Sequence, residues 1–120
     1  MINTVYNILE PLNIPILYIL RPKNDSSNKI VISYHFFNEG YELHGDGKGK
    51  EFGGSLQVDV FSLSDYTSIV NQVKNLLETN KFKLAPGGSR DSDDSFNNVQ
   101  YYHKILVFNY VEEEVKIDEL

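Results

Sequence analysis

The segment from Ile30 to Phe37 constrains the fold most, because both faces of the strand that it predicts are apolar. Side chains alternate across a β-strand. The two faces therefore carry Ile30, Ile32, Tyr34 and Phe36 on one side, and Val31, Ser33, His35 and Phe37 on the other. A strand of this kind needs cover on both sides, either from the chain's own elements or from another subunit.

A helix from about Asp65 to Thr79 is predicted by apolar residues that recur at three- and four-residue steps. Ser62 and Asp65 have the spacing of a capping box, and Asn80 suits the left-handed position just past the helix end. The expected apolar stripe consists of Tyr66, Ile69, Val70, Val73, Leu76 and Leu77.

The remaining elements complete the order helix, three strands, helix, two strands. A first helix begins near Asn3, which suits an N-cap, and stops at Pro11. Further strands are expected at Ile14–Leu20, Ser55–Phe61, Lys81–Leu84 and Val99–Val111, with polar connections at Arg21–Lys29, Gly45–Gly54 and Ala85–Asn98. The order predicts an α+β fold, with a single mixed or antiparallel sheet and two helices packed on one face. We expect one domain over residues 1–111 and an acidic C-terminal tail over residues 112–120.

Composition and charge exclude several classes of function. The 120 residues contain no cysteine, which excludes disulfides, cysteine-ligated zinc, iron–sulfur clusters and a cysteine nucleophile. The formal net charge is −6 and the Lys and Arg residues are scattered, so specific nucleic-acid binding is not expected. No signal-peptide pattern or membrane-spanning run is present, and we expect an intracellular soluble protein, a description that also fits a virion protein assembled inside a cell.

The glycine-rich segment Gly45–Gly54 does not match a phosphate-binding loop. The glycine spacing of a P-loop and of a dinucleotide fingerprint is missing, and no helix follows the segment. His44 and Asp46 are too few ligands for a metal site. We therefore expect no cofactor and no metal, and interpret the segment as a flexible tip.

Two histidines and one aspartate raise the hypothesis of a metal-dependent hydrolase. His35, Asp59 and His103 lie on three predicted strands and would form a site only if they converge. A hydrogen-bonded histidine within a sheet is the more common arrangement, and no nucleophile motif or paired carboxylates accompany them. The expectation is no catalytic residue.

Polar loops and aromatic strand positions are the candidates for contacts with other proteins. The partner-contact candidates are Asp46, Lys48, Lys50, Arg90, Asp91, Asp93 and Asp94. The candidates for a subunit interface are Phe37, Tyr102 and Phe108.

Three stretches taken together resemble the tail-terminator or tail-completion proteins, which are small minor tail proteins of long-tailed bacteriophages. The stretches are Leu56-Gln57-Val58-Asp59-Val60-Phe61-Ser62, the helix from Asp65 to Leu77 that closes on Lys81-Phe82, and Tyr101-Tyr102-His103-Lys104 leading to Phe108-Asn109-Tyr110. The likeness covers roughly residues 30–110. Lys81-Phe82 stands where the family more often has Gly-Phe.

The resemblance implies a non-enzymatic structural protein of the virion tail, assembled in the cytoplasm of a bacterial host from a phage or prophage gene. Members form an oligomeric ring, usually hexameric, on the head-proximal end of the tail tube. There the ring ends tube growth and allows head joining, so the implied partners are copies of the chain, the major tail tube protein and head-completion proteins. A ferredoxin-like regulatory or small-molecule-binding domain is the alternative that the element order leaves open.

Overall fold

The computed structural model describes residues 1–19, 30–43, 50–96, 99–112 and 115. Side chains are described at all of these positions except 41–43, 50, 51, 93–96 and 99. The elements are α1 (Ile2–Leu9), a 3₁₀ turn (Glu10–Leu12), β1 (Ile16–Tyr18), β2 (Ile30–Leu43), β3 (Lys50–Ser62), α2 (Thr67–Thr79), β4 (Lys83–Phe96) and β5 (Val99–Val111). None of the helices in the described ranges is long and apolar enough to cross a membrane.

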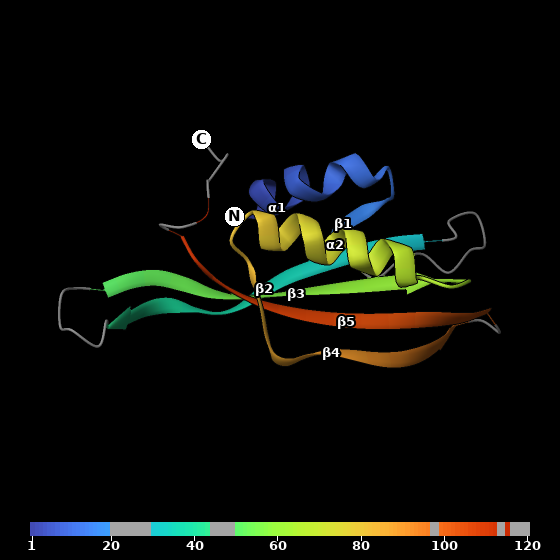
Figure 1. The fold of residues 1–120 in the computed structure, drawn as a ribbon. Coiled ribbons are helices and arrows are strands. Elements are labelled where there is room, and N and C mark those ends of the chain that lie inside the picture. Colours follow the sequence, from blue (N-terminus) through green and yellow to red (C-terminus); the bar gives the residue numbers. More distant parts are fainter. Residues whose placement is uncertain (20–29, 44–49, 97–98, 113–114, 116–120) are drawn as a thin grey trace.

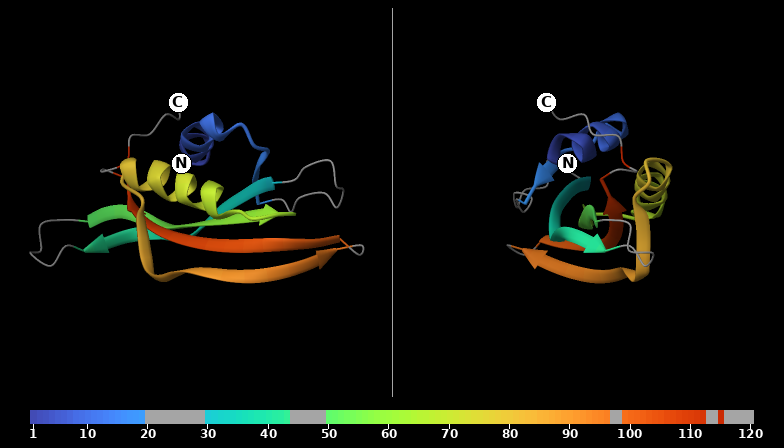
Figure 2. Two further views of the ribbon diagram at one scale, coloured as in Figure 1. Left: turned by 45° about the vertical axis from the view of Figure 1, so that its right-hand side comes forward. Right: turned by 90° about the vertical axis from the view of Figure 1, so that its left-hand side faces the viewer.

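The strands form one five-stranded mixed sheet in the order β1-β2-β3-β5-β4 (Figure 1). The β1–β2 pair is parallel, and the other three pairs are antiparallel. Both helices lie on the same face of the sheet (Figure 2). This confirms the predicted α+β class. The order also differs from the β-α-β-β-α-β order of a ferredoxin-like domain, because β1, β2 and β3 follow one another without a helix.

The main core lies between the helices and the central strands. It is formed by the alternate strand residues that the sequence pattern assigns to one face, together with the apolar stripes of the helices. Its largest fully buried side chains are Leu9, Ile32, Tyr34, Leu56, Leu77, Phe82, Leu106 and Phe108. The Tyr34 hydroxyl donates a 2.7 Å hydrogen bond to the Ile2 carbonyl, so α1 is joined to β2 through the core.

The face of the sheet without helices is also largely buried at one end. Val31, Phe61, Tyr101 and Ile105 are all buried there, although no helix covers them. The sheet is strongly coiled, and β4 lies on the side away from the helices (Figure 2). A single copy therefore buries these apolar residues without needing another subunit to cover them.

The boundaries of both helices differ from the predicted caps. Asn3 lies inside α1 and does not cap it. Ahead of α2, Asp65 accepts hydrogen bonds from the Thr67 amide at 2.9 Å and the Thr67 hydroxyl at 2.7 Å, whereas Ser62 accepts one from the Ser64 amide. The expected capping box is therefore wrong, because Asp65 itself binds the helix entrance.

The end of α2 differs by one residue from the prediction. Asn80 has a φ of −97°, and the left-handed conformation falls on Lys81, with a φ of 72°. The side-chain amide of Asn80 donates a 2.7 Å hydrogen bond to the Leu76 carbonyl, and so satisfies one of the free carbonyls of the last helical turn.

The largest departure from the sequence analysis is β4. Most of Ala85–Asn98, expected as a loop, pairs with β5 up to Phe96, while residues 97 and 98 lie outside the described chain. The pairing shifts register between Leu84 and Ser89, where a Cβ on Gly88 would come within 2.7 Å of the Val107 carbonyl oxygen. This segment has a weak intrinsic preference for strands, and it forms one because its backbone pairs with β5.

The β2–β3 hairpin is longer than predicted. β2 continues to Leu43, and β3 begins at Lys50, so the second half of the glycine-rich segment is strand. A Cβ on Gly53 would lie 2.3 Å from the Tyr110 carbonyl oxygen, which explains the need for glycine where β3 meets β5. The first half of the predicted flexible segment, residues 45–49, lies outside the described residues.

Candidate functional site

A buried polar cluster lies on the helix-free face of the sheet. His103 Nε2 donates to Asp59 Oδ1 at 3.0 Å, and both residues are only 8% exposed. Gln57 Nε2 donates to the two carboxylate oxygens of Asp59 at 3.1 and 3.3 Å. The His103 ring stacks on Phe61 with 4.2 Å between ring centroids. These contacts satisfy the aspartate and orient the imidazole, as expected for a structural histidine of a sheet.

His35 does not complete a metal site with this pair. Its register partner on β3 is Gln57, and its ring lies against Phe37 at a centroid distance of 6.1 Å. No group of three possible ligands gathers anywhere in the part of the chain that the structure describes. Of the three residues in the hydrolase hypothesis, Asp59 and His103 therefore come together as a buried hydrogen-bonded pair, and His35 does not join them.

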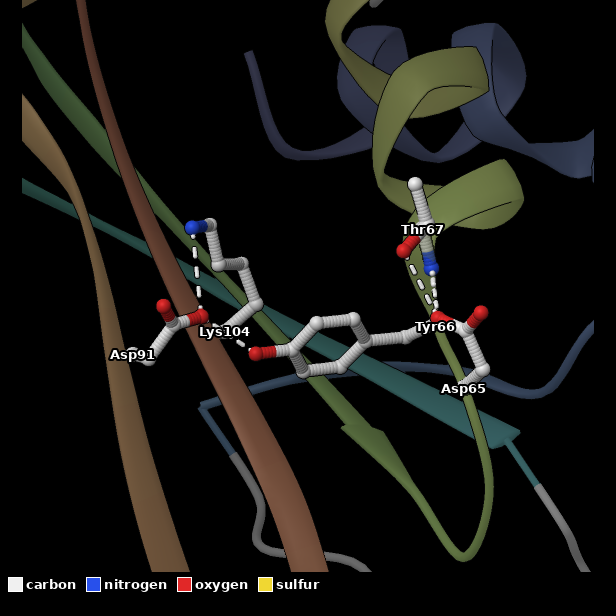
Figure 3. A network of polar contacts seen from close by, with 5 residues as sticks. All are labelled: Asp65, Tyr66, Thr67, Asp91 and Lys104. Atoms are coloured by element: carbon white, nitrogen blue, oxygen red, sulfur yellow. Dashed lines mark hydrogen bonds and ion pairs between the residues drawn. The ribbon is translucent and has the colours of Figure 1, made fainter.

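Asp91 belongs to a second polar cluster, on the helix side of the sheet (Figure 3). Its Oδ1 accepts hydrogen bonds from the Tyr66 hydroxyl and from Lys104 Nζ, the latter at 3.2 Å. These two donors, Tyr66 first, lower the pKa of Asp91 below its ordinary value. Similarly, the hydrogen bonds from Thr67 lower the pKa of the neighbouring Asp65. Tyr66, the residue just before α2, thus connects the start of this helix to the edge strand β4. The sequence pattern predicted only that Tyr66 belongs to the apolar stripe of the helix.

The other partner-contact candidates divide between strand and undescribed positions. Arg90 is exposed on β4 and pairs in register with Ile105, so it points to the face opposite Asp91. Asp46 and Lys48 lie outside the described residues. Lys50, Asp93 and Asp94 are paired strand positions whose side chains are not described. Asp91, Asp93 and Asp94 are therefore part of an edge strand and not of a loop.

The three aromatic interface candidates have different surroundings. Tyr102 is 49% exposed on β5, and Phe37 is half-buried on β2. Phe108 is fully buried in the main core, so it offers no surface to a neighbouring subunit. The error has a physical cause: alternation places Phe108 on the face that α2 covers, together with Leu106 and Tyr110.

Exposed apolar residues missed by the sequence analysis lie at the β1 border of the fold. Ile2 and Tyr6 on α1 are 42% and 43% exposed, and Ile19 after β1 is 62% exposed. The four-residue spacing of Ile2 and Tyr6 was the available signal, since it puts both on one face of a helix.

Comparisons with known proteins give weak structural likenesses. Neither a protein-family model nor a curated protein matches the sequence. A solved structure of the virion of a native gene transfer agent particle has a chain that aligns with a TM-score of 0.48 and 14% identity, covering 89% of this chain and 90% of that chain. The sheath/tube terminator of PVC, an extracellular contractile injection system, in its extended state, aligns with a TM-score of 0.39 and 11% identity, covering 91% of this chain and 54% of its own. Both alignments are too distant to establish a common function.

Proposed function

We propose that this chain is a structural tail-terminator subunit of a phage or prophage. Copies of the chain form a ring, hexameric in the family that it resembles, on the head-proximal end of the tail tube. The ring stops tube growth and presents a surface for head-completion proteins. The role is non-enzymatic and places the protein in the virion tail.

The observation that carries the proposal is the order of the sequence motifs. Strand Leu56–Ser62, the following helix, Lys81-Phe82 and strand Tyr101–Tyr110 occur in the order typical of terminator proteins. In the fold these stretches lie on β3, α2, the turn after α2 and β5, and they pack on one another. The residues that resemble terminator proteins therefore form the centre of the domain.

The surface chemistry is compatible with a subunit of a ring around a DNA passage. The net charge of −6 opposes binding to the phosphates of DNA that moves through a central hole. Exposed apolar side chains at Ile2, Tyr6, Ile19 and Tyr102 supply candidate contacts between protein subunits.

The proposal is tested by tube capping. A tail tube protein from the phage or prophage that encodes this chain is polymerised with and without the purified protein, and tube lengths and ends are measured by electron microscopy. We expect shorter tubes with added density at one end. Tyr102→Ala should reduce capping, whereas Glu78→Ala, an exposed change on α2, should not. Unchanged tube lengths and bare ends with the wild-type chain would refute the function.

A further inference from the structure

The outer edge of β2 is open over most of its length. β1 pairs only with the three residues Ile32–Tyr34, although β2 continues to Leu43. The Ile19 amide donates to the Tyr34 carbonyl at 2.9 Å, and Ile19 then adopts a φ of 69°. A left-handed conformation at a β-branched residue turns the backbone sharply. Past Tyr34, no strand in the described ranges pairs with this side of β2.

The backbone groups on this edge are oriented for pairing with another strand. The Ile32 amide donates to the Pro15 carbonyl, and the Tyr34 carbonyl accepts from Ile19, so these two residues direct their backbone toward β1. Because backbone direction alternates along a strand, Phe36 directs its amide and carbonyl toward the same edge, where β1 has ended. Beyond Phe36 the strand bulges between Phe37 and Gly40, where Asn38 has a φ of 53°, and it then pairs with β3 again up to Leu43. The outer backbone groups before and after this bulge are a template for a strand of another chain.

The opposite border of the sheet offers a second open edge. Among the strands that the structure describes, β4 pairs with β5 alone, and it is regular from Ser89 to Phe96 after its register shift. The stretches Phe36–Leu43, which contains the bulge between Phe37 and Gly40, and Ser89–Phe96 each span eight residues. Their directions also match, because the pairings make β3 antiparallel to β2, β5 antiparallel to β3, and β4 antiparallel to β5. β4 therefore runs opposite to β2.

We propose that copies of this chain join head to tail by antiparallel pairing of β2 residues 36–43 of one copy with β4 residues 89–96 of the next. This interface rests on the proposed ring function and gives it a structural basis. When every copy has the same sheet orientation, the two edges meet as antiparallel strands, and the helices of all copies lie on one side. The contact is heterologous, and a rotation that closes it generates a ring.

Exposed apolar side chains border both edges on the helix side. Ile2, Tyr6 and Ile19 lie beside the β1–β2 border. Tyr102 lies at the other border, where it pairs in register with Asp93 of β4. Joining the two edges brings these groups toward one another, so apolar burial adds to the backbone pairing.

The charges of the two edges set the conditions for pairing. Residues 36–43 contain two glutamates, and residues 89–96 contain three aspartates and one arginine. Both edges are thus acidic and repel one another at low ionic strength. Salt screens this repulsion, so head-to-tail association strengthens as the salt concentration rises.

Cysteine cross-linking tests the interface, since the natural chain has no cysteine. Glu42→Cys and Arg90→Cys alter residues that face one another when residues 36–43 and 89–96 pair end to end. The double variant is treated with a short bismaleimide, alone at low and high salt and with assembled tail tubes, and analysed by denaturing gel. We expect a ladder of linked dimers, trimers and larger species, and loss of the ladder in each single variant. The matched control, Glu78→Cys with Arg90→Cys, gives no ladder.

Other outcomes overturn the interface and separate its failure from that of the ring. Native mass spectrometry is applied to the same samples, and tube capping is scored in parallel. Oligomers or capped tubes without a ladder refute the edge pairing and leave the ring function standing. Dimers linked in the Glu42→Cys single variant indicate an isologous contact between two β2 edges and likewise refute it. Monomers in every sample, with tubes left uncapped, overturn the interface and the function together.

Discussion

The Tyr66 hydroxyl donates a hydrogen bond to the Asp91 carboxylate and so connects the entrance of α2 with the edge strand β4. Lys104 on the adjacent strand β5 binds the same carboxylate oxygen (Figure 3). β4 contains few residues that favour strands, and its order depends on β5 and on this contact with the helix layer. If β4 is one edge of the subunit interface, this cluster holds that edge in a form that can pair.

Tyr66→Phe is therefore expected to loosen β4 without unfolding the domain. Loss of the hydroxyl removes the larger of the two contacts that lower the pKa of Asp91, so that pKa rises toward its ordinary value. Hydrogen exchange should show faster exchange of the β4 amides, and Tyr102→Phe should leave them unchanged. Equal β4 exchange in the two variants would show that the cluster does not hold the strand.

Tyr110→Phe is expected to stabilise the domain. The Tyr110 hydroxyl is buried and has no hydrogen-bond partner in the described chain. A buried unsatisfied polar group costs about 1–3 kcal/mol, so replacing it with hydrogen should raise the free energy of unfolding by about 1 kcal/mol. Urea unfolding at neutral pH measures the change, and a destabilised variant would indicate that the hydroxyl does have a partner.

The same substitution changes the response to alkali. Burial, with smaller contributions from Glu39 and Glu112, raises the pKa of Tyr110 to about 12. The folded pKa exceeds the unfolded value of about 10, so the stability linked to the protonated phenol is complete below about pH 10 and is lost as the pH rises through 12. Tyr110→Phe should accordingly lose less stability than the wild type between these pH values.

Leu77→Ala and Leu76→Ala test the orientation of α2. Leu77 is fully buried in the core and Leu76 is partly exposed. Truncation of a buried leucine costs about 2–5 kcal/mol, so Leu77→Ala should lower the free energy of unfolding by that amount and Leu76→Ala by less. Denaturant unfolding of both variants checks the order, and the reverse order would mean that the helix is rotated.

Gly53→Ala and Gly40→Ala test the close approach of β3 and β5. A Cβ at Gly53 would lie 2.3 Å from the Tyr110 carbonyl oxygen, whereas a Cβ at Gly40 meets no atom within 4 Å. Forcing the two strands apart should cost about 1–3 kcal/mol at Gly53. Thermal unfolding should show a clear loss for Gly53→Ala only. Equal melting temperatures would contradict the described approach of the strands.

Local sequence patterns correctly predicted the elements whose own residues follow a clear apolar periodicity. The alternation in Val99–Val111 gives the bounds of β5 as observed, and the apolar stripe of α2 faces the core as expected except at Leu76, which is partly exposed. The failure at β4 has a clear reason, since Pro86, Gly87 and the serines and aspartates after them have low strand propensity, and only pairing with β5 makes this segment a strand.

The contacts of the candidate site depend on register, which no local pattern reveals. His103 and Asp59 are hydrogen-bonded because β3 and β5 pair with Phe61 opposite His103. The open edge of β2 depends on where β1 stops, and Ile19 stops it by a backbone conformation that is unusual for isoleucine. Sequence reasoning about uncovered apolar faces pointed to self-association, whereas among the described residues it is the backbone at the two sheet edges that no strand pairs with.

Self-association into a closed ring is the central claim, and native mass spectrometry of the purified chain over a range of salt and protein concentrations tests it most directly. A closed heterologous ring predicts one dominant oligomer of fixed stoichiometry, whose fraction rises with salt. A chain that remains monomeric under all conditions, or that forms an open series of ever larger species with no preferred size, would contradict the account.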